Sequence, residues 1–368
     1  MTEAASRNRA EITIAGRRIG RAHEPFVICE LSGNHNGSLD RALALVDAAA
    51  ATGADAIKIQ TYTPDTMTID CDRPEFRIRG GPWDGQTLYD LYGEAHTPYE
   101  WHERLFARAR ERGVILFSTP FDETAIDLLE SLGAPAYKIA SFEATDLRLI
   151  AAVARRGKPM IISTGMSNLG DITAAVETAR SNGADGVALL HCTSAYPAPI
   201  ADANVRTIPH LADAFGVVAG LSDHTLSSAT SIAAVAVGAA IIEKHFTLAR
   251  ADGGPDAAFS LEPDEFAALV KDSKDAWRAL GGVSYSVKSS EKANTAFRRS
   301  LYIVEAVSKG EPVPASAVRA IRPGHGLRTE HMPRVVGRRA VRDLVRGEPV
   351  AWDMLGGATD TVEEIQQA

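Results

Sequence analysis

The sequence predicts an α/β fold, a parallel (β/α)₈ barrel (TIM barrel) followed by a small second domain. Two observations predict the barrel. Eight short apolar runs, each followed by an amphipathic helical stretch, alternate over roughly 250 residues, the usual size of this fold. The runs also end in polar or charged residues, and such barrels carry their functional side chains at the C-terminal ends of the strands. A closed barrel with one active site fits this pattern better than an open doubly wound sheet.

The eight expected strands are centred on 26–30, 56–60, 114–118, 136–140, 159–163, 187–191, 217–221 and 240–245. The expected helices lie near 39–51, 98–112, 122–132, 145–156, 171–182, 203–215, 225–238 and 263–280. Local signals mark their ends. Ser38 and Gly53 flank the first helix as an N-cap and a C-terminal stop. The segment Thr97-Pro98-Tyr99-Glu100 predicts a capping box with proline at the first helical position of the second helix.

The connection from Thr61 to His96 is too long for an ordinary loop between a strand and a helix. Long connections in compact domains are usually functional lids or disordered segments. The aromatic residues Trp83, Tyr89 and Tyr92 argue for order. Because this insert starts at the end of the second strand, we expect it to be a lid or a substrate wall over the catalytic face. The alternative is an insertion that only decorates the barrel or packs in an oligomer.

The pattern changes after residue 281, where Gly281-Gly282 and a polar stretch predict a linker. Short β-like pieces at 300–304 and 350–352 and turn signals such as Lys309-Gly310 follow. We therefore predict a catalytic barrel over 1–283, a linker over 284–296, a compact second domain over 297–356 and a flexible tail over 357–368.

Composition excludes several classes of protein. The chain has 368 residues, 45% of them hydrophobic and 23% charged, and its net charge is −8. That balance gives no electrostatic footprint for nucleic acid, so we expect no nucleic-acid partner. No apolar stretch approaches the roughly 20 residues that span a bilayer, and the start of the chain lacks the apolar region of a secretory signal. Cys29, Cys71 and Cys192 form no CxxC pair, and the first and last fit small core residues. These features predict a cytoplasmic, reduced protein without a membrane partner.

Two histidines and two lysines stand out among the strand ends. His224 and His245 end adjacent strands, so they can hold a divalent metal such as Mn²⁺, Fe²⁺ or Zn²⁺, or be hydrogen-bonding core residues. Lys58 and Lys138 lie in apolar runs, where a buried ammonium needs an anion. That anion is either a barrel carboxylate or a ligand phosphate or carboxylate. Convergence with nearby hydroxyls favours the ligand, the hydroxyls being Thr119, Ser141, Ser163 and Ser222.

Three glutamates also end strands, and each can be a general base, a hydroxyl acceptor or a lysine counter-ion: Glu30, Glu143 and Glu243. Asp256 follows the last strand in Gly253-Gly254-Pro255-Asp256, where the simpler interpretation is a tight turn. Arg322 lies in an Arg-Pro-Gly segment of the second domain, where a surface charge is the default.

The motifs around these residues resemble those of the sialic acid synthase family. They occur in the family's order from about residue 10 to residue 355: Ser32-Gly33-Asn34-His35-Asn36-Gly37-Ser38, Ile57-Lys58-Ile59-Gln60-Thr61, Phe117-Ser118-Thr119-Pro120-Phe121, Tyr137-Lys138-Ile139-Ala140-Ser141, Ser163-Thr164-Gly165-Met166, His191-Cys192-Thr193, 220–225 and 243–246. The C-terminal segment resembles the family's antifreeze-like (SAF) domain, with Arg322-Pro323-Gly324 in the matching place.

The resemblance implies a transferase that condenses phosphoenolpyruvate with an N-acetylated amino sugar in its open-chain form. It implies that a divalent metal (Mn²⁺, Mg²⁺ or Co²⁺) is held by His224 and His245, and that Glu30 acts with them as a catalytic residue. The implied phosphoenolpyruvate-binding residues are Lys58, Thr119, Lys138, Ser141, Ser163, Ser194 and Ser222. The implied sugar-binding residues are Gln60, Glu143, Tyr196, Glu243, Asp256 and Arg322. The family often has Asn where this chain has Ser194, a departure that bears on one phosphate or carboxylate contact.

The resemblance further implies a domain-swapped homodimer, in which Arg322 of one subunit reaches the sugar's N-acetyl group at the partner's barrel. Within the family, the insert resembles the branch that makes pseudaminic acid, through Gly81-Pro82-Trp83, Leu88-Tyr89-Asp90-Leu91-Tyr92 and Ala95-His96-Thr97-Pro98. The alternatives in the same class make N-acetylneuraminate or legionaminate. An alternative of another class is a carbohydrate- or ice-binding protein that works through the second domain. Such a module has no need of buried lysines and histidines at barrel strand ends.

Overall fold

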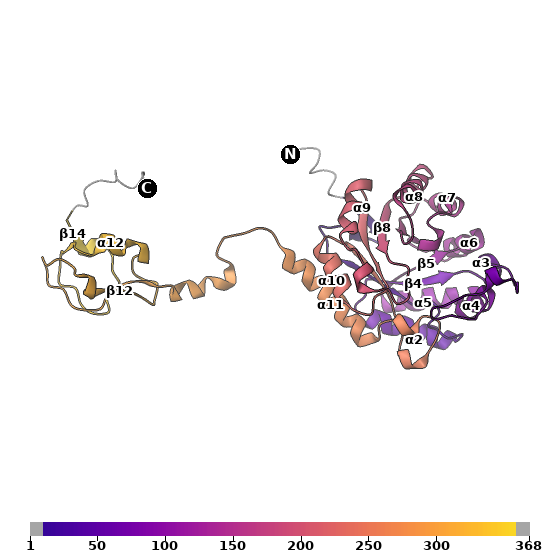
Figure 1. Cartoon of the computed structure of the whole chain (residues 1–368), viewed down its shortest axis with the longest axis horizontal. Helices are drawn as coiled ribbons and strands as arrows, with labels where there is room; N and C mark the ends of the chain where they lie inside the picture. Colours follow the sequence, from indigo (N-terminus) through magenta and orange to yellow (C-terminus); the bar gives the residue numbers. More distant parts are fainter. Residues whose placement is uncertain (1–9, 358–368) are drawn as a thin grey trace. The chain divides into compact units, whose positions relative to one another are not determined.

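The computed structural model describes residues 10–357, which fall into two compact units divided after Gly281. Figure 1 shows the first unit as strands surrounded by helices. Part of the predicted tail, residues 358–368, lies outside the described residues. No helix in the described part of the chain is long and apolar enough to cross a membrane.

The first unit is a closed barrel of eight parallel strands in the spatial order β10-β3-β4-β5-β6-β7-β8-β9, so the predicted (β/α)₈ fold is confirmed. The strands are β3 (Phe26–Glu30), β4 (Ala56–Thr61), β5 (Ile115–Pro120), β6 (Tyr137–Ile139), β7 (Met160–Ser163), β8 (Val187–Cys192), β9 (Val218–Asp223) and β10 (Ile241–His245). The helices that follow them are α2 (Leu39–Ala51), α5 (His102–Arg112), α6 (Glu123–Ser131), α7 (Leu147–Ala154), α8 (Leu169–Ser181), α9 (Thr207–Phe215), α10 (Ala229–Ala236) and α11 (Pro263–Leu280).

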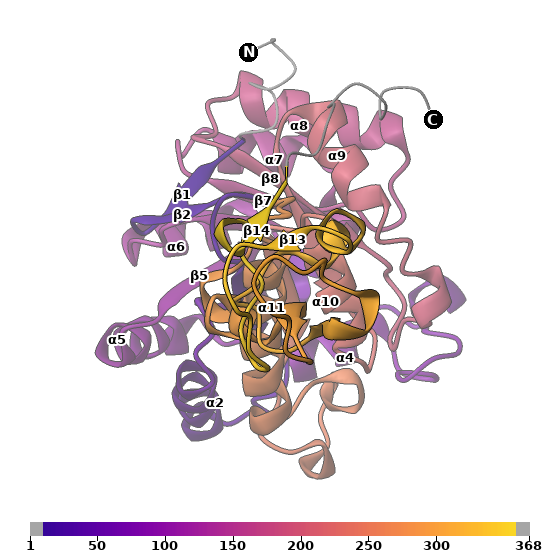
Figure 2. The same ribbon diagram turned by 90° about the vertical axis from the view of Figure 1, so that its left-hand side faces the viewer.

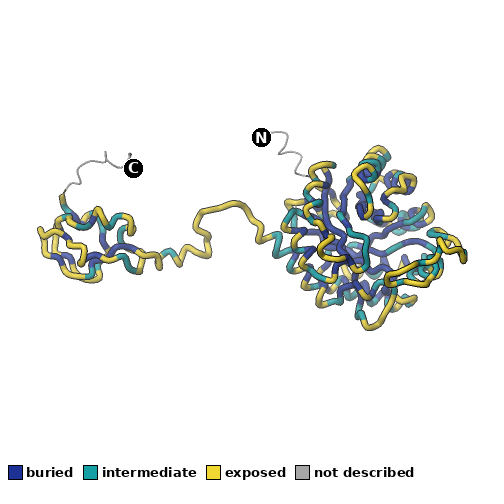
Figure 3. Tube along the Cα trace, in the orientation of Figure 1, coloured by how far each residue is buried: buried dark blue, intermediate teal, exposed yellow. Residues whose placement is uncertain are grey.

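The inside of the barrel changes from apolar to polar along the strands. Side chains on a strand alternate between its two faces, so every second residue points inward. On β3 the inward residues are Phe26 and Ile28 and then Glu30, and on β10 they are Ile241 and then Glu243 and His245. The lower, N-terminal half of the interior is therefore a packed apolar core, and the polar side chains gather above it. Figure 3 shows the strands as the most buried part of this unit.

A short antiparallel hairpin, which the sequence analysis did not predict, packs against that lower core. It consists of β1 (Ile12–Ile14) and β2 (Arg17–Ile19), which lie side by side in Figure 2. Its isoleucines join the apolar residues inside the barrel. The turn residues Ala15 and Gly16 have φ of 47° and 81°, as a two-residue hairpin turn of this kind needs. The Ala-Gly pair after the alternating triplet Ile12-Thr13-Ile14 was the available signal, but strands of three residues are too short for a periodicity to be recognised.

The expected capping box at Thr97–Glu100 is wrong. A 3-10 helix, η2 (Tyr99–Trp101), comes first, and α5 begins only at His102 without a capping side chain. Thr97 is not available as a cap because it is buried, with its Oγ1 3.5 Å from Nε2 of His35. The predicted capping box needed the Thr97 hydroxyl, and in the folded chain this hydroxyl faces His35 instead.

The insert is ordered and contains helical segments. These are α3 (Pro64–Met67), η1 (Pro74–Phe76) and α4 (Leu88–Ala95). Tyr89 donates to Oδ1 of Asp65 at 3.2 Å, and Tyr62, at the start of the insert, packs edge-on against Tyr92 and Phe121. Contacts of aromatic side chains therefore hold parts of the insert together, as the sequence analysis expected.

The second unit has a small core of its own. Its paired strands are β11 (Ser300–Ile303) with β12 (Val318–Ile321), and β13 (Arg339–Ala340) with β14 (Leu355–Gly356). Leu301, Ile303, Val318 and Val335 are among its fully buried residues. The remaining segments are α12 (Met332–Val335) and the 3-10 helices η7 (Ser289–Glu291), η8 (Ala293–Phe297), η9 (Ala315–Ala317), η10 (Thr329–His331) and η11 (Trp352–Met354). The predicted linker region thus contains η7 and most of η8.

We predict that Gly220→Ala destabilises the barrel, because a Cβ at Gly220 on β9 would lie 2.3 Å from the carbonyl oxygen of Ile241 on β10. Neighbouring strands would have to move apart, and overpacking of this kind costs about 1–3 kcal/mol. Urea unfolding measures the loss. Gly282→Ala is the matched control, since a Cβ there meets no atom within 4 Å. Equal stability of the two variants would contradict the prediction.

Candidate active site

Four buried charged side chains meet in the upper part of the barrel interior: Glu30, Lys58, Lys138 and Glu243, here called the charged cluster. Nζ of Lys58 lies 3.0 Å from Oε2 of Glu30 and 3.4 Å from Oε1 of Glu243. Nζ of Lys138 lies 3.8 Å from the same oxygen of Glu243. Four different strands bring these charges together, because inward positions near the strand ends converge in a barrel.

The nearby carboxylates only partly offset the cost of burying the positive charge of Lys138. Burial raises the pKa of Glu30. Burial alone would also raise the pKa of Glu243, but Lys138 and Lys58 outweigh it and hold that pKa below its ordinary value. Burial lowers the pKa of Lys138 to about 8, despite the nearby Glu243 carboxylate. An anionic ligand beside Lys138 would therefore stabilise its charged form.

Hydroxyl groups surround the two ammonium groups. Lys138 donates to Oγ of Ser163 at 2.7 Å, and Lys58 donates to Oγ1 of Thr119 at 3.4 Å. Ser222 donates to Glu243 at 3.2 Å. Hydroxyls and ammonium groups are the usual donors to a phosphate or carboxylate.

Gly165, after β7, makes room for two more hydroxyls. Its backbone N–H donates to Oγ of Ser141 at 3.1 Å. A Cβ at this position would lie 2.2 Å from Oγ of Ser194 and 2.8 Å from Oγ of Ser141, so a side chain would displace both serines. The hydroxyls predicted for phosphoenolpyruvate thus lie at the C-terminal ends of β5 to β9, around the charged cluster.

The two histidines lie side by side at the ends of β9 and β10, with ring centroids 5.3 Å apart. Nδ1 of His224 faces the carbonyl oxygen of Thr193 at 3.0 Å, and Nδ1 of His245 faces Oγ of Ser32 at 3.3 Å. Tyr196 lies over His224, with 4.4 Å between the rings. Burial lowers the pKa of His245 well below its ordinary value, so this imidazole is neutral and able to bind a metal.

These histidines could hold a metal only together with ligands from substrate or water. Burial opposes the charged form of His224, but the neighbouring Cys192 raises its pKa above the ordinary value, so a metal at that ring would compete with a proton. Nδ1 of each ring is turned to protein atoms, which holds the ring in place and leaves Nε2 for an ion, a usual arrangement for metal-binding histidines. Oδ2 of Asp256 lies 3.8 Å from Nδ1 of His245. Within residues 10–357, no group of three or more His, Cys, Asp or Glu side chains is arranged to hold a metal without other ligands.

The residues predicted to bind the sugar are spread over both units. Gln60 donates to Oε1 of Glu30 at 2.8 Å, so it adjoins the charged cluster. Glu143 is in the 3-10 helix η3 (Ser141–Glu143) after β6, where burial raises its pKa to about 7. Burial also raises the pKa of Asp256, next to His245. Arg322 is exposed and belongs to the second unit, directly after β12.

The insert reaches this site through Trp83, which the sequence analysis did not name as a site residue. The indole Nε1 donates to the carbonyl oxygen of Pro255 at 2.8 Å, directly before Asp256. The indole ring packs against Tyr196 at 5.6 Å and Phe259 at 6.4 Å between centroids, and Phe259 also contacts His245. The available signal was the aromatic content of the insert. Its partners could not be read from sequence because they lie more than 100 residues away.

Two further residues at the site were missed, Ser32 and Cys192. Ser32 faces His245, as described above. Cys192 is buried, as expected for a core residue, but its Sγ lies 3.9 Å from Nδ1 of His224. Burial opposes ionisation of the thiol, yet the neighbouring His224 lowers the pKa of Cys192 to about 7. Its position at the end of β8 was the only sequence signal.

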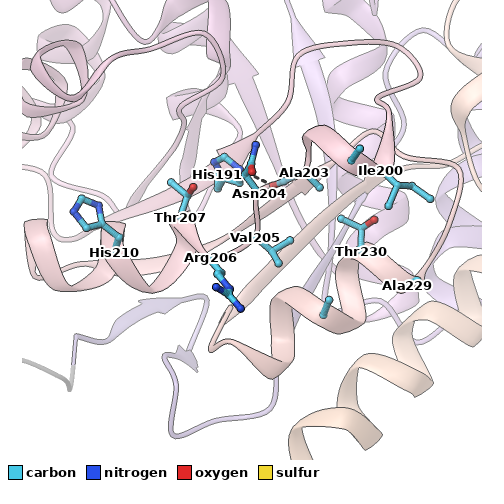
Figure 4. A pocket seen from close by; sticks show the side chains of 12 residues that line it. His191, Ile200, Ala203, Asn204, Val205, Arg206, Thr207, His210, Ala229 and Thr230 are labelled. Carbon is cyan, nitrogen blue, oxygen red and sulfur yellow. Dashed lines mark hydrogen bonds between the residues drawn. The ribbon is translucent and has the colours of Figure 1, made fainter.

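A cavity of about 920 Å³ opens elsewhere, between α9 and α10 (Figure 4). His191, Arg206, His210 and Thr230 are among its lining residues, and Nε2 of His191 contacts the carbonyl oxygen of Ala203 at 2.8 Å. His191 lies on the outward face of β8, between the inward-facing Leu190 and Cys192. None of the charged cluster lines this cavity.

The chain is similar in sequence and in fold to known proteins. A model of the NeuB family matches residues 45–285, and a model of the SAF domain matches residues 298–356. The chain is 42% identical to the pseudaminic acid synthase of Campylobacter jejuni (strain 81-176), over 88% of this chain and 94% of that protein. It is 36% identical to the N,N'-diacetyllegionaminic acid synthase of Legionella pneumophila, over 89% of this chain and 94% of that protein. The crystal structure of N-acetylneuraminic acid synthetase from Leptospira borgpetersenii superposes with a TM-score of 0.69 at 31% identity, covering 78% of this chain and 95% of the other.

We predict that Glu143→Gln stabilises the protein at pH 8 and changes little at pH 4.5. The folded-state pKa of Glu143, about 7, is above the ordinary value of 4.5, so ionisation of the buried carboxyl destabilises the fold as pH rises between these values. The full difference is about 3 kcal/mol, since each pH unit corresponds to about 1.4 kcal/mol. Urea unfolding of both proteins at pH 4.5 and pH 8 measures it. A stability difference that does not change with pH would contradict the assignment.

Proposed function

The chain belongs to the NeuB family, and we propose that it is a pseudaminic acid synthase. The reaction joins phosphoenolpyruvate, water and 2,4-diacetamido-2,4,6-trideoxy-L-altrose to give pseudaminic acid and phosphate. The observation that carries the proposal is the charged cluster, with its hydroxyls, next to the histidine pair at the barrel mouth. The lysines of the charged cluster can bind the phosphate and carboxylate of a phosphorylated acid. The histidine pair beside them can bind the aldehyde, which is the electrophile. The choice of sugar is supported by the similarity to the Campylobacter enzyme and by the insert.

Phosphoenolpyruvate binds at the charged cluster in this proposal. Its phosphate and carboxylate carry up to three negative charges, which compensate Lys58 and Lys138. The hydroxyls around them orient the anion: Thr119, Ser141, Ser163, Ser194 and Ser222. Ser194 stands where the family often has Asn. Its hydroxyl is still a hydrogen-bond donor, and it lies in the space that the missing side chain of Gly165 leaves open. The barrel excludes bulk water, so these charge-assisted contacts are stronger than they would be at a surface.

The reaction forms one C–C bond and one C–O bond and breaks the C–O bond to phosphate. Carbon 3 of phosphoenolpyruvate attacks the sugar aldehyde, whose oxygen becomes a hydroxyl after gaining a proton. Positive charge develops at carbon 2, water adds there and loses a proton, and the tetrahedral intermediate expels phosphate to leave the 2-keto acid. No oxidant or reductant is required.

Glu30 is the proposed base for the water that adds to carbon 2, or the counter-charge for the cationic centre. Its Oε2 lies 3.0 Å from Lys58 and its Oε1 accepts from Gln60, so the carboxylate is held in a fixed orientation. Burial raises its pKa, which makes it a better proton acceptor than an ordinary carboxylate.

His224 and His245 would hold a divalent metal, with Mn²⁺, Mg²⁺ and Co²⁺ as candidates. When bound, such an ion acts as a Lewis acid that polarises the aldehyde of the sugar and fixes its orientation. The histidines are suited to this role because Thr193 and Ser32 hold Nδ1 of each ring. The proposed contacts of the sugar hydroxyl and acetamido groups are Asp256, Glu143, Glu243, Gln60 and Tyr196. Trp83 lies on the same side of the mouth.

The direct test is phosphate release from phosphoenolpyruvate with each of three sugars, in EDTA and after Mn²⁺ is added back. We expect turnover with the trideoxy-L-altrose diacetamide, loss of turnover in EDTA and recovery with Mn²⁺. Preference for the legionaminate precursor or for N-acetylmannosamine would overturn the choice of sugar and keep the reaction class. Absence of phosphate release with all three sugars would overturn the catalytic assignment.

A second prediction concerns Arg322. We propose that the protein is a homodimer in which Arg322 of one subunit contacts the sugar bound at the barrel of the other. Arg322→Ala is expected to raise the KM for the sugar at least tenfold, equivalent to about 1.4 kcal/mol of lost interaction, and to leave the KM for phosphoenolpyruvate unchanged. Arg319→Ala is the control, since Arg319 is also exposed and lies three residues earlier, on β12. Similar sugar KM values for the two variants would contradict the role of Arg322.

A further inference from the structure

A second buried ion pair lies on the outer side of the barrel, directly behind the two histidines. Nζ of Lys244 lies 3.0 Å from Oδ2 of Asp223, and both side chains are almost completely buried, with 0% and 1% of their surface exposed. Each belongs to the residue that precedes a histidine, Asp223 before His224 and Lys244 before His245. Since side chains alternate along a strand, these two point outward where the histidines point inward.

The pair joins the two strands in register. Asp223 on β9 and Lys244 on β10 are direct neighbours in the parallel ladder. Their salt bridge therefore fixes the spacing of the two strands one residue before each histidine. A shift of either strand end would move one imidazole relative to the other.

The same two side chains also hold the turn that follows His224. Nζ of Lys244 donates to the carbonyl oxygen of Thr225, and the backbone N–H of Thr225 donates to Oδ1 of Asp223 at 2.9 Å. Ser231 on α10 donates to Oδ2 of Asp223 at 2.7 Å. His224 thus lies between two residues, Asp223 and Thr225, that are both tied to this network.

Stability alone gives a poor account of such a pair. Desolvation of two buried charges offsets most of their attraction, and an apolar pair of similar volume is often as stable. In some proteins a buried pair with defined hydrogen bonds selects one geometry among several. The geometry that it fixes here is that of the histidine pair.

We propose that Asp223 and Lys244 are positioning residues that set the separation and orientation of His224 and His245 for metal binding. The metal part of this inference rests on the proposed function, whereas the positioning of the imidazoles does not. The pair itself contacts neither substrate nor metal.

The test is the double variant Asp223→Asn with Lys244→Met. The asparagine keeps an acceptor for Thr225 and a polar partner for Ser231, while both buried charges and the bond from Lys244 to Thr225 are removed. We expect the dissociation constant for Mn²⁺, measured by titration calorimetry on the full chain, to rise 10- to 100-fold, as for other outer-shell partners of metal ligands. In the metal-free protein, ¹⁵N-labelled imidazole resonances of His224 and His245 should shift, and those of the other eight of the ten histidines should not.

The matched control is Asp55→Asn with Lys274→Met. Asp55 and Lys274 form an ion pair with Nζ and Oδ2 3.4 Å apart, and Oδ2 of Asp55 accepts from the N–H of Val27 at the opposite, N-terminal end of the barrel. This variant should alter stability without changing Mn²⁺ affinity or the two imidazole resonances. Ser231→Ala, which removes one bond to Asp223 and suits a helix, guards against an unfolded double variant and should give a smaller shift of the same resonances.

Unchanged resonances and an Mn²⁺ affinity within twofold of the unmodified protein would overturn the proposal. If the unmodified protein bound no Mn²⁺, the metal role under the proposed function would fail, and the imidazole resonances alone would decide whether the pair positions the histidines. Shifts of equal size in the control would also overturn it, because they would show a general loss of structure.

Discussion

The structure of the active site depends on burying two ammonium groups and two carboxylates together inside the barrel. Lys58, Lys138, Glu30 and Glu243 are charges that a protein interior excludes unless they are paired. Their mutual contacts make the burial possible. Because the pairing is incomplete, the cluster can still bind a further anion. Lys138 is only loosely paired, 3.8 Å from Glu243, and burial lowers its pKa to about 8. An anionic ligand beside Lys138 would complete this pairing.

A packed apolar core lies directly beneath these charges in the lower half of the barrel. Phe26, Ile28, Phe117 and Ile241 fill the interior beneath them, and the β1–β2 hairpin adds isoleucines to the same core. Water does not reach the cluster from below, and the electrostatic contacts above are correspondingly strong. The same strand therefore provides a packed core at one end and chemistry at the other.

The upper side of the site is closed by aromatic contacts from far apart in the sequence. Trp83 of the insert, Tyr196 after β8 and Phe259 after β10 pack on one another and on the histidine rings. These contacts hold Trp83 of the insert beside the histidine pair at the mouth of the barrel. Side chains from three separate segments of the chain therefore close this side of the site.

The sequence by itself determined the barrel, because eight strand–helix units in a row admit few other arrangements. It also placed Glu30, Lys58, Lys138, His224 and His245 at strand ends, where a barrel must bring them together. Only the tertiary structure decided which lysine faces which glutamate, that Trp83 packs on Tyr196, that Thr97 is buried and caps no helix, and that Asp223 pairs with Lys244 behind the histidines. The reason is that hydrophobic periodicity is a local property that specifies faces and ends, whereas side-chain pairing depends on distances between segments that meet only when the barrel closes.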